Sequence, residues 1–319
     1  DNSKILLLNH TIKFWTVLLV GTFLLMFAAF YNGFPIVYSD TSTYLASGFE
    51  LETPFDRPIT YGLFVRLFSL NGGSLWFVVF FQTLILVLLI ILSVRLVIPN
   101  HKSLWVSLLL IFLLTLLSSI SWTTCQLMPD IFTPIAVLSL ILVLSGKYQG
   151  AVKYLLYFIF WLAVAMHISH ILLFVSILFL VFCLQKIIIP ESFRVKINTR
   201  LLTLLLVTLS SIVTMGSAIS KSRHVFFMGA MVEHGIAKQY LDEYCAEHKY
   251  KLCSYRDSLP RRAYQFVWDD TSPLYKIGSW KGSKKEFGEI IYGSLVKPKY
   301  TFLHIKASLK VTAQQLLLS

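Results

Sequence analysis

Two carboxylic acids stand at the ends of long apolar segments, where they could take part in chemistry. Asp40 lies a few residues beyond the first apolar segment, and Asp130 follows Pro129 at the start of a later one. If these apolar segments cross a membrane, a carboxylate just outside the hydrocarbon core of the bilayer reaches water and can stay charged. Each acid could equally be the cap of a following helix. The two explanations are compatible, because a cap also fixes the position of a carboxylate that acts as a general base.

The polar segments around these acids could hold a sugar-like ligand. The loop over residues 38–74 is rich in aromatic side chains and contains the turn Asp56-Arg57-Pro58. The segment before Asp130 offers Trp122, Gln126 and several hydroxyl groups. Because the two acids come from separate loops, they could share one acceptor molecule.

Two histidines three residues apart, His167 and His170, interrupt another apolar run. Histidines near a membrane span are often hydrogen-bonded structural groups, which is the first explanation. The spacing would also suit a metal, but the surrounding residues match no metal motif, and we expect no divalent metal. A third explanation is that one histidine hydrogen-bonds the phosphate or sugar of a ligand.

The last hundred residues differ in kind from the rest, because basic and aromatic side chains alternate there. Arg261 and Arg262 are candidates for binding a phosphate. The alternative is a solvated region attracted to anionic lipid headgroups. Cys245 and Cys253 lie close enough in sequence for a disulfide, which would place the region in an oxidising compartment; two unpaired thiols are the other possibility.

The elements that position these residues must be membrane helices. Of the 319 residues, 56% are hydrophobic, and the mean hydropathy is +0.71. These values predict an all-α polytopic membrane protein. The net charge of +12 would suit a nucleic-acid partner, but much of it lies in short loops between apolar segments, so we expect no nucleic acid.

About seven spans are expected in a helical core over residues 1–218, followed by a region outside the membrane over residues 219–319. The run from Tyr154 to Ile189 is too long for one helix, and we divide it near His167 into a hairpin. The other apolar segments are Phe14–Ala29 and its continuation, Leu75–Val97, Leu104–Ile120, Ile131–Leu144 and Leu201–Ala218. The amphipathic end of the chain, Leu309 to Leu318, looks interrupted, and we expect a further span beyond it.

The distribution of positive charge predicts how these spans are oriented in the membrane. With a cytoplasmic N-terminus, ten basic residues fall on the cytoplasmic side: Lys4, Lys13, Arg95, Lys102, Lys147, Lys153, Lys186, Arg194, Lys196 and Arg200. Asp40, Asp56, Asp130, both histidines and the C-terminal region then share the outer face.

The order of these features resembles the GT-C fold of membrane glycosyltransferases, which includes protein O-mannosyltransferases and lipid A aminoarabinose transferases. The matching residues are Asp40 with Tyr44, Arg57-Pro58 with Tyr61-Gly62, and Met128-Pro129-Asp130. The resemblance covers about the first 190 residues. This sequence lacks the Asp-Glu pair that follows the first span in familiar members of the family.

The resemblance implies an inverting transfer of a sugar from a polyprenyl-phosphate donor to a glycan, lipid or protein acceptor. Asp40 would be the base, with Asp130 as a second acid in the same cavity. Tyr44, Arg57 and Tyr61 would bind substrate, and His167, His170, Arg261 or Arg262 would hold the lipid phosphate. The protein would lie in a bacterial inner membrane with its active face in the periplasm, in contact with membrane lipids.

Two other classes of function remain open. A flippase or transporter of an anionic lipid-linked sugar would use the same outer surface, but its spans should carry deeper polar groups than the scattered Ser, Thr and Gln82 found here. A non-catalytic assembly partner of an envelope complex would need neither Asp40 nor Asp130.

Overall fold

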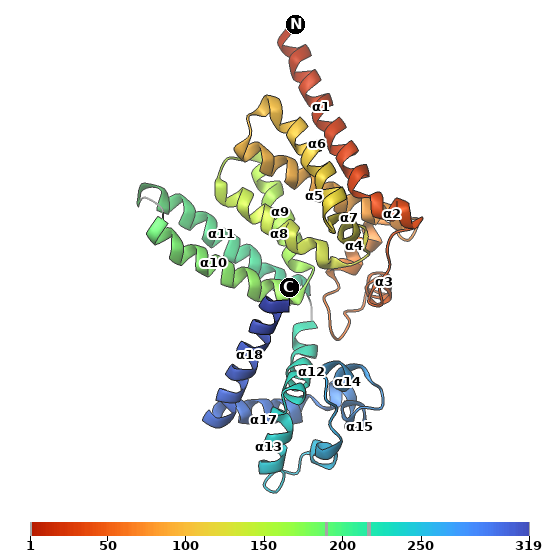
Figure 1. The fold of residues 1–319 in the computed structure, drawn as a ribbon, viewed down its shortest axis with the longest axis vertical. Helices are drawn as coiled ribbons and strands as arrows, with labels where there is room; N and C mark the ends of the chain where they lie inside the picture. The colour runs from red at the N-terminus through yellow and green to blue at the C-terminus, as the bar shows by residue number, and fades with distance from the viewer. Residues whose placement is uncertain (1, 189–190, 216–217, 319) are drawn as a thin grey trace. The chain divides into compact units, whose positions relative to one another are not determined.

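The protein is all-helical over the residues that its computed structural model describes, which are 2–188, 191–215 and 218–318. These residues form no strand, and their one isolated β-bridge joins Ile36 to Gln126. The all-α class expected from the sequence is therefore confirmed. The chain divides into two compact units, Asp1–Gly216 and Ser217–Ser319, close to the division at residue 218 that the composition predicts. Each unit is described by itself (Figure 1).

The first unit is built from helices that pack around one hydrophobic core. Its shorter helices, α2, α3, α4, α7 and the 3₁₀ turn η1, connect the longer ones. In chain order the helices are α1 (Asn2–Leu25), α2 (Phe27–Asn32), α3 (Thr41–Glu50), α4 (Thr60–Phe68), α5 (Leu75–Val97), α6 (Asn100–Leu117), α7 (Ile120–Cys125), η1 (Pro129–Ile131), α8 (Phe132–Ser145), α9 (Gly150–Ala165), α10 (Ile168–Ile188) and α11 (Glu191–Met215).

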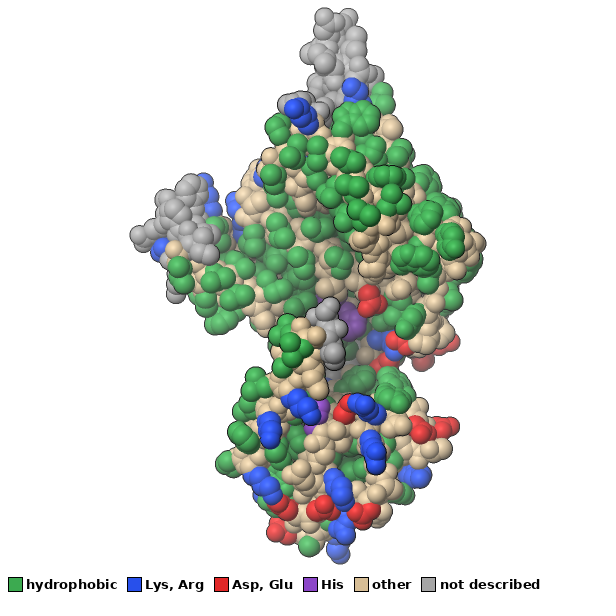
Figure 2. Space-filling view, viewed as in Figure 1, with side chains coloured by type: hydrophobic (Ala, Val, Ile, Leu, Met, Phe, Trp, Pro, Cys, Tyr) green, Lys and Arg blue, Asp and Glu red, His purple; other side chains and the backbone are tan. Residues whose placement is uncertain are grey.

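Three segments of this unit are long and apolar enough to cross a membrane: Leu75–Val97, Ile168–Gln185 and Arg194–Met215. Four shorter apolar helices accompany them, within α1, α6, α8 and α9. Hydrophobic side chains cover much of the surface of this unit (Figure 2), which indicates association with a membrane. The larger number of spans and their orientation stay predictions. The described part of the chain does not include the side chains of Lys4 and Lys186, or residues Ile189, Gly216 and Ser217 of the apolar segments.

The long apolar run from Tyr154 divides where the sequence predicts. Helix α9 ends at Ala165 and α10 begins at Ile168. The His167 side chain takes part in this break, because its Nδ1 accepts a hydrogen bond from the Ser169 backbone N–H at 3.3 Å. That contact satisfies one of the free amides that every helix N-terminus exposes. The predicted interruption is confirmed.

Helices α3 and α4 touch through two glycines. A Cβ added to Gly62 would lie 2.3 Å from the Ser47 Oγ and 2.6 Å from the Gly48 nitrogen. A Cβ on Gly48 would lie 2.1 Å from the Gly62 carbonyl oxygen. Only glycine at both positions allows such a close approach of two backbones. The sequence between Asp40 and Arg66 is therefore folded back on itself as a tight helix pair.

The second unit has its own hydrophobic core, centred on residues such as Tyr240, Phe266 and Phe287. Cys245 and Cys253 form a disulfide, as the sequence predicts. The Glu286 carboxylate accepts the backbone N–H groups of Lys251 and Leu252 at 2.8 and 2.9 Å. The elements are α12 (Ala218–Glu233), α13 (Ile236–Tyr244), η2 (Lys251–Ser258), α14 (Ala263–Trp268), α15 (Pro273–Lys276), α16 (Ser279–Gly282), α17 (Lys284–Val296) and α18 (Pro298–Leu318).

Candidate functional site

A nearly buried arginine holds two carboxylates at the start of α3. The Arg57 Nη1 lies 3.1 Å from Asp40 Oδ2, and its Nε donates to Asp56 Oδ2 at 2.8 Å. The side chains of Arg57 and Asp56 are 12% and 11% exposed, whereas that of Asp40 is 47% exposed. Burial opposes the charge of Arg57, but the hydrogen bond and charge of Asp56 outweigh it and raise the pKa of the guanidinium. Asp40 is thus the member of the trio that faces solvent.

Asp40 occupies the N-cap position of α3, yet its carboxylate makes no capping hydrogen bond. Its backbone carbonyl accepts the N–H groups of Thr43 and Tyr44 at 3.1 and 3.3 Å. The Thr41 hydroxyl instead fixes the turn, by accepting the Tyr38 N–H at 2.8 Å. The carboxylate of Asp40 is therefore free of the capping role that the sequence left as one explanation.

Two tyrosines lie beneath this trio. Tyr44 is 3% exposed and its ring lies under the Arg57 guanidinium, 4.9 Å from the ring centroid. It meets the ring of the fully buried Tyr61 edge to face, at 5.2 Å between centroids. Burial raises the pKa of Tyr44 to about 12, against the lowering effect of Arg57. Tyr44 supports Arg57 directly, and Tyr61 supports Tyr44. Both rings are buried in this structure, and their predicted contact with substrate stays a prediction.

Tyr61 is fixed in turn by Gln82, the one amide within the apolar helix α5. The Tyr61 hydroxyl donates to Gln82 Oε1 at 3.2 Å. The Gln82 Nε2 donates to the carbonyls of Thr124 and Gln126 at 2.6 and 2.8 Å. An amide in an apolar helix must find such partners, because burying it alone is costly. Gln82 therefore joins α4 to the segment that leads to Asp130.

The segments that carry the two acids are also joined directly. The Ile36 N–H donates to the Cys125 carbonyl at 2.9 Å, and the Leu127 N–H donates to the Ile36 carbonyl at 2.8 Å. One step further on, the Thr41 hydroxyl donates to the Leu127 carbonyl at 3.2 Å. Asp130 is exposed in η1, three residues beyond this contact. Its charge acts on Tyr44 and Tyr61, raising the pKa of each after the larger effect of burial.

The two histidines differ in their surroundings. His170 is 3% exposed, and its ring nitrogens lie 2.8 Å from the Ala163 carbonyl and 2.8 Å from the Thr133 hydroxyl. With both nitrogens occupied, His170 matches the structural explanation and has no group left for a ligand. His167 is exposed. Although the residue is exposed, partial loss of hydration around the ring lowers its pKa, with Asp130 acting in the opposite sense and Arg57 in the same sense.

The first unit therefore brings Asp40, Arg57, Asp130 and His167 to one end of its helices. We call these four residues and Asp56 the acidic end. Chemically, it offers two exposed carboxylates and one exposed imidazole around a nearly buried guanidinium. Such groups can move a proton and hydrogen-bond hydroxyls. The described residues contain no group of three His, Cys, Asp or Glu side chains placed to hold a metal ion.

Arg261 and Arg262 lie in the second unit, on the segment before α14. Both are exposed. Arg262 Nη1 lies 3.3 Å from Glu233 Oε1, and the other oxygen of that carboxylate accepts the Ala263 N–H at 3.0 Å. Arg262 is thus paired with an acid of its own unit. The predicted contact of this arginine pair with a phosphate stays a prediction.

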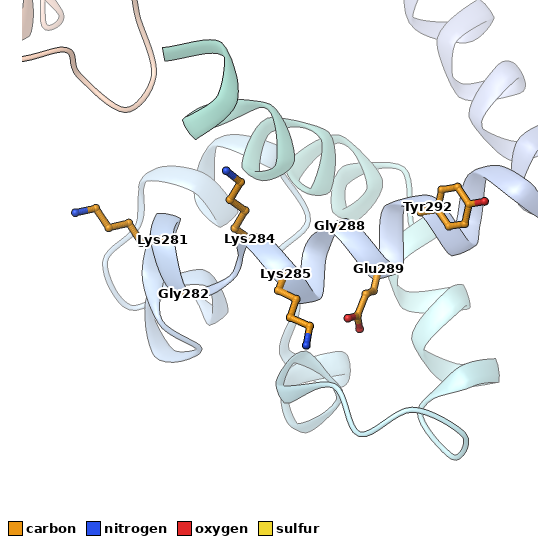
Figure 3. Close-up of a pocket in the computed structure, with 7 residues that line it drawn as sticks. All are labelled: Lys281, Gly282, Lys284, Lys285, Gly288, Glu289 and Tyr292. Carbon is orange, nitrogen blue, oxygen red and sulfur yellow. The ribbon is translucent and has the colours of Figure 1, made fainter. Parts of the chain in front are cut away.

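A broad hollow of about 690 Å³ lies on the second unit, lined by Lys281, Lys284, Lys285, Glu289 and Tyr292. Figure 3 shows that the three lysine side chains point in different directions. Their amines do not converge on one point, so the hollow is not shaped to hold a single anion.

Two roles went unrecognised in the sequence, the ion pair of Asp56 with Arg57 and the hydrogen bonds of Gln82. The turn Asp56-Arg57-Pro58 was recognised, and its adjacent opposite charges were the sign of an ion pair. Gln82 stands alone in a helix of 23 residues that is otherwise nearly all apolar, which was the sign of a buried hydrogen-bonded role.

Comparisons of this chain with family models, with curated proteins and with solved structures found no match.

Proposed function

We propose that the protein is a membrane glycosyltransferase that uses a polyprenyl-phosphate sugar donor and acts at the acidic end of its first unit. The observation that carries the proposal is the state of Asp40. One of its oxygens is held by Arg57 at 3.1 Å, while nearly half of its side chain stays exposed. A carboxylate with a fixed position and a free face is suited to accept a proton from a bound hydroxyl.

In the proposed reaction, Asp40 takes the proton of the acceptor hydroxyl as its oxygen attacks the anomeric carbon of the donor sugar. The bond between that carbon and the phosphate oxygen breaks, and polyprenyl phosphate leaves with the bonding electrons. The configuration at the anomeric carbon is inverted. Asp130 hydrogen-bonds sugar or acceptor hydroxyls from the neighbouring loop.

The leaving phosphate needs positive charge or hydrogen-bond donors where its negative charge develops. His167 is the exposed candidate within the first unit. Because its pKa is lowered, it is a neutral donor in the absence of a ligand, and an anionic phosphate would raise that pKa. Arg261 and Arg262 are further candidates. His170 and Tyr61, which are buried and already hydrogen-bonded, are assigned to positioning rather than to contact with substrate.

The acceptor is proposed to be a glycan, lipid or protein of the cell envelope, on the periplasmic side of a bacterial inner membrane. Exposed apolar helices and the disulfide of the second unit support this location. Membrane lipids surround the first unit, and no metal has a part in the proposed reaction.

The test is the transfer of labelled sugar in membranes that contain the full chain and a polyprenyl-phosphate donor pool. Asp40→Asn removes the base without changing its size, and transfer should fall by a factor of about 10² to 10⁴. Glu50→Gln is the matched control, because Glu50 is an exposed acid at the other end of the same helix α3, and it should transfer at the wild-type rate.

Equal transfer by Asp40→Asn and wild type, at matched levels of inserted protein, would contradict the proposal. It would leave the assembly partner or the transporter as the better explanation. Loss of transfer with both Asp40→Asn and Glu50→Gln would also contradict it, because the effect would then not be specific to the site.

A further inference from the structure

Asp130 lies just before the start of α8, and four basic side chains lie near the end of that helix. Arg95 lies in the last turn of α5, Lys147 follows α8, Lys153 lies in the first turn of α9, and Arg200 lies in α11. We call this group the basic end. Helices α8, α9 and α11 pack on one another there.

Backbone carbonyls near helix C-termini hold the side chains of the basic end without neutralising their charge. Arg200 Nη1 donates to the Leu144 carbonyl in the last turn of α8 at 2.8 Å, and the Tyr148 hydroxyl donates to the Leu92 carbonyl within α5 at 2.6 Å. Lys147 donates to the Arg95 carbonyl. Each helix C-terminus carries only about half a negative charge. The ends of α5 and α8 together therefore offset roughly one of the four positive charges.

The sequence around these charges is poor in acids, and the first acid after Asp130 is Glu191, at the start of α11. Between Arg57 and Pro190 the sequence holds a single acid, Asp130, which belongs to the acidic end. Two buried donor atoms of Arg95, Nε and Nη2, have no hydrogen-bond partner. The Arg95 guanidinium packs instead on the Phe14 ring, 5.0 Å from its centroid. Buried donors without acceptors are costly, so Arg95 adds positive charge to the basic end that no acceptor offsets, although Arg95 does not line the cavity described next.

A small polar cavity is present among these groups. It has a volume of about 70 Å³, and Tyr148, Lys153, Tyr157 and Arg200 are among its lining residues. Since a water needs at least about 10–15 Å³ of such volume, the cavity has room for roughly five atoms of that size. Those are the dimensions of a phosphate group. Lysine, arginine and tyrosine are also the donors that bind phosphate oxygens.

An apolar groove lies on the neighbouring face of α11. It measures about 330 Å³ and runs between α10 and α11, where Leu178, Phe182, Leu201 and Leu205 are among its lining residues. Leu201 directly follows Arg200, which lines the polar cavity. A phosphate site and an acyl-sized groove on adjacent residues of one membrane-type helix fit a lipid better than a free anion.

We infer that the basic end binds an anionic phospholipid. Its phosphate occupies the cavity between Lys153, Tyr157 and Arg200, and one acyl chain lies along the groove between α10 and α11. The lipid supplies negative charge to this end, and it ties together α8, α9 and α11.

The experiment is native mass spectrometry of the full chain released from nanodiscs that contain phosphatidylcholine and phosphatidylglycerol in equal amounts. Wild type should retain phosphatidylglycerol in preference to phosphatidylcholine. Lys153→Gln should lower the retained phosphatidylglycerol about tenfold, the loss expected for one charge-assisted hydrogen bond. Arg200→Gln should do the same, but it also removes the bond to Leu144, so Lys153→Gln is the decisive variant.

Lys196→Gln is the matched control, because Lys196 is exposed on α11 one turn before Arg200 and does not line the cavity. It should retain as much lipid as wild type. Equal retention of the two lipids by wild type, or equal losses with Lys153→Gln and Lys196→Gln, would overturn the inference. Displacement of phosphatidylglycerol by excess inorganic phosphate would overturn it as well, by assigning the cavity to a free anion.

Discussion

Arg57 is the residue on which the acidic end depends. It is nearly buried, it contacts Asp40, Asp56 and the Tyr44 ring, and it lies three residues before Thr60, where α4 begins. A buried charge is tolerated only with partners. Asp56 is as buried as Arg57, so these two side chains support each other, and Asp40 gains a fixed position from the pair.

Removing one partner of the buried pair should therefore cost more than removing both. We expect Arg57→Gln to lower the free energy of unfolding by about 3 kcal/mol, because it leaves the Asp56 carboxylate buried without a counter-charge. The double variant Arg57→Gln/Asp56→Asn should recover a large part of that loss. Thermal unfolding in detergent measures both. Additive losses in the double variant would show that the two side chains are not coupled.

His167 should make stability depend on pH. Its pKa lies below the usual 6.5 in the folded protein, so the unfolded chain binds more protons as the pH falls through 6.5. Stability is then complete above pH 6.5 and is lost as the pH falls from there to the folded pKa. The groups that act on the ring are Asp130, which raises the pKa, and Arg57, which lowers it; the His170 ring lies 5.6 Å away.

The matched variant is His167→Asn, because asparagine can still accept the Ser169 N–H but does not titrate. The difference in free energy of unfolding between wild type and His167→Asn should be constant above pH 6.5. Below pH 6.5, wild type should lose stability relative to the variant. Chemical unfolding between about pH 5 and pH 8 measures this difference. A difference that does not change with pH would refute the lowered pKa.

At the scale of elements, the close pair of α3 and α4 decides where the site residues meet. Asp40 stands at the start of α3 and Arg57 lies in the turn before α4. The contact between Gly48 and Gly62 fixes the distance between the two helices. Separation of the helices would move Arg57 away from Asp40, so the two glycines position the site from a distance.

Gly62→Ala tests this arrangement. Its Cβ would overlap the Ser47 hydroxyl and the Gly48 nitrogen, and overpacking of this kind lowers the free energy of unfolding by about 1–3 kcal/mol or more. Gly288→Ala in α17 is the matched control, because nothing lies within 4 Å of its Cβ. The control should be stabilising by about 0.5–1 kcal/mol, since alanine is the better helix former. Similar thermal stability of the two variants would contradict the close contact.

At the scale of the whole molecule, charged and apolar side chains are divided between two units and between the two ends of the first. The first unit carries the acidic end, the basic end and the apolar helices. The second unit carries the disulfide and a surface on which Lys, Arg, Asp and Glu side chains are mixed (Figure 2). Because each unit has its own core, damage to one core should leave the other folded.

Loss of the disulfide should show this independence. Cys245 and Cys253 are 8 residues apart in sequence, and closing a loop of that length stabilises the folded state by about 2–3 kcal/mol. The variant Cys245→Ala/Cys253→Ala should make the second unit more sensitive to proteolysis. The first unit, which contains neither cysteine, should keep its wild-type resistance. Limited proteolysis with mass mapping reads the two units separately. Equal sensitisation of both units would contradict their independence.

From sequence alone we could predict the helical class, the interruption at His167 and the positions of the two acids outside apolar segments, and we could name the disulfide as one of two possibilities. These features depend on local composition and spacing, which follow from hydrophobic periodicity and from the chemistry of single residues. The sequence could not choose between a cap and a free carboxylate for Asp40, or between a structural and a binding role for His170, because each choice depends on partners far away in sequence.

The tertiary structure alone decided those choices. It paired Arg57 with Asp40 and hydrogen-bonded Thr133 to His170. It also showed that Gln82 hydrogen-bonds both Tyr61 and the segment before Asp130. It brought Lys153 of α9 and Arg200 of α11 to the lining of one cavity. Local pattern fixes which groups are polar and where helices stop, but only packing decides which polar groups satisfy one another and which are left to bind something else.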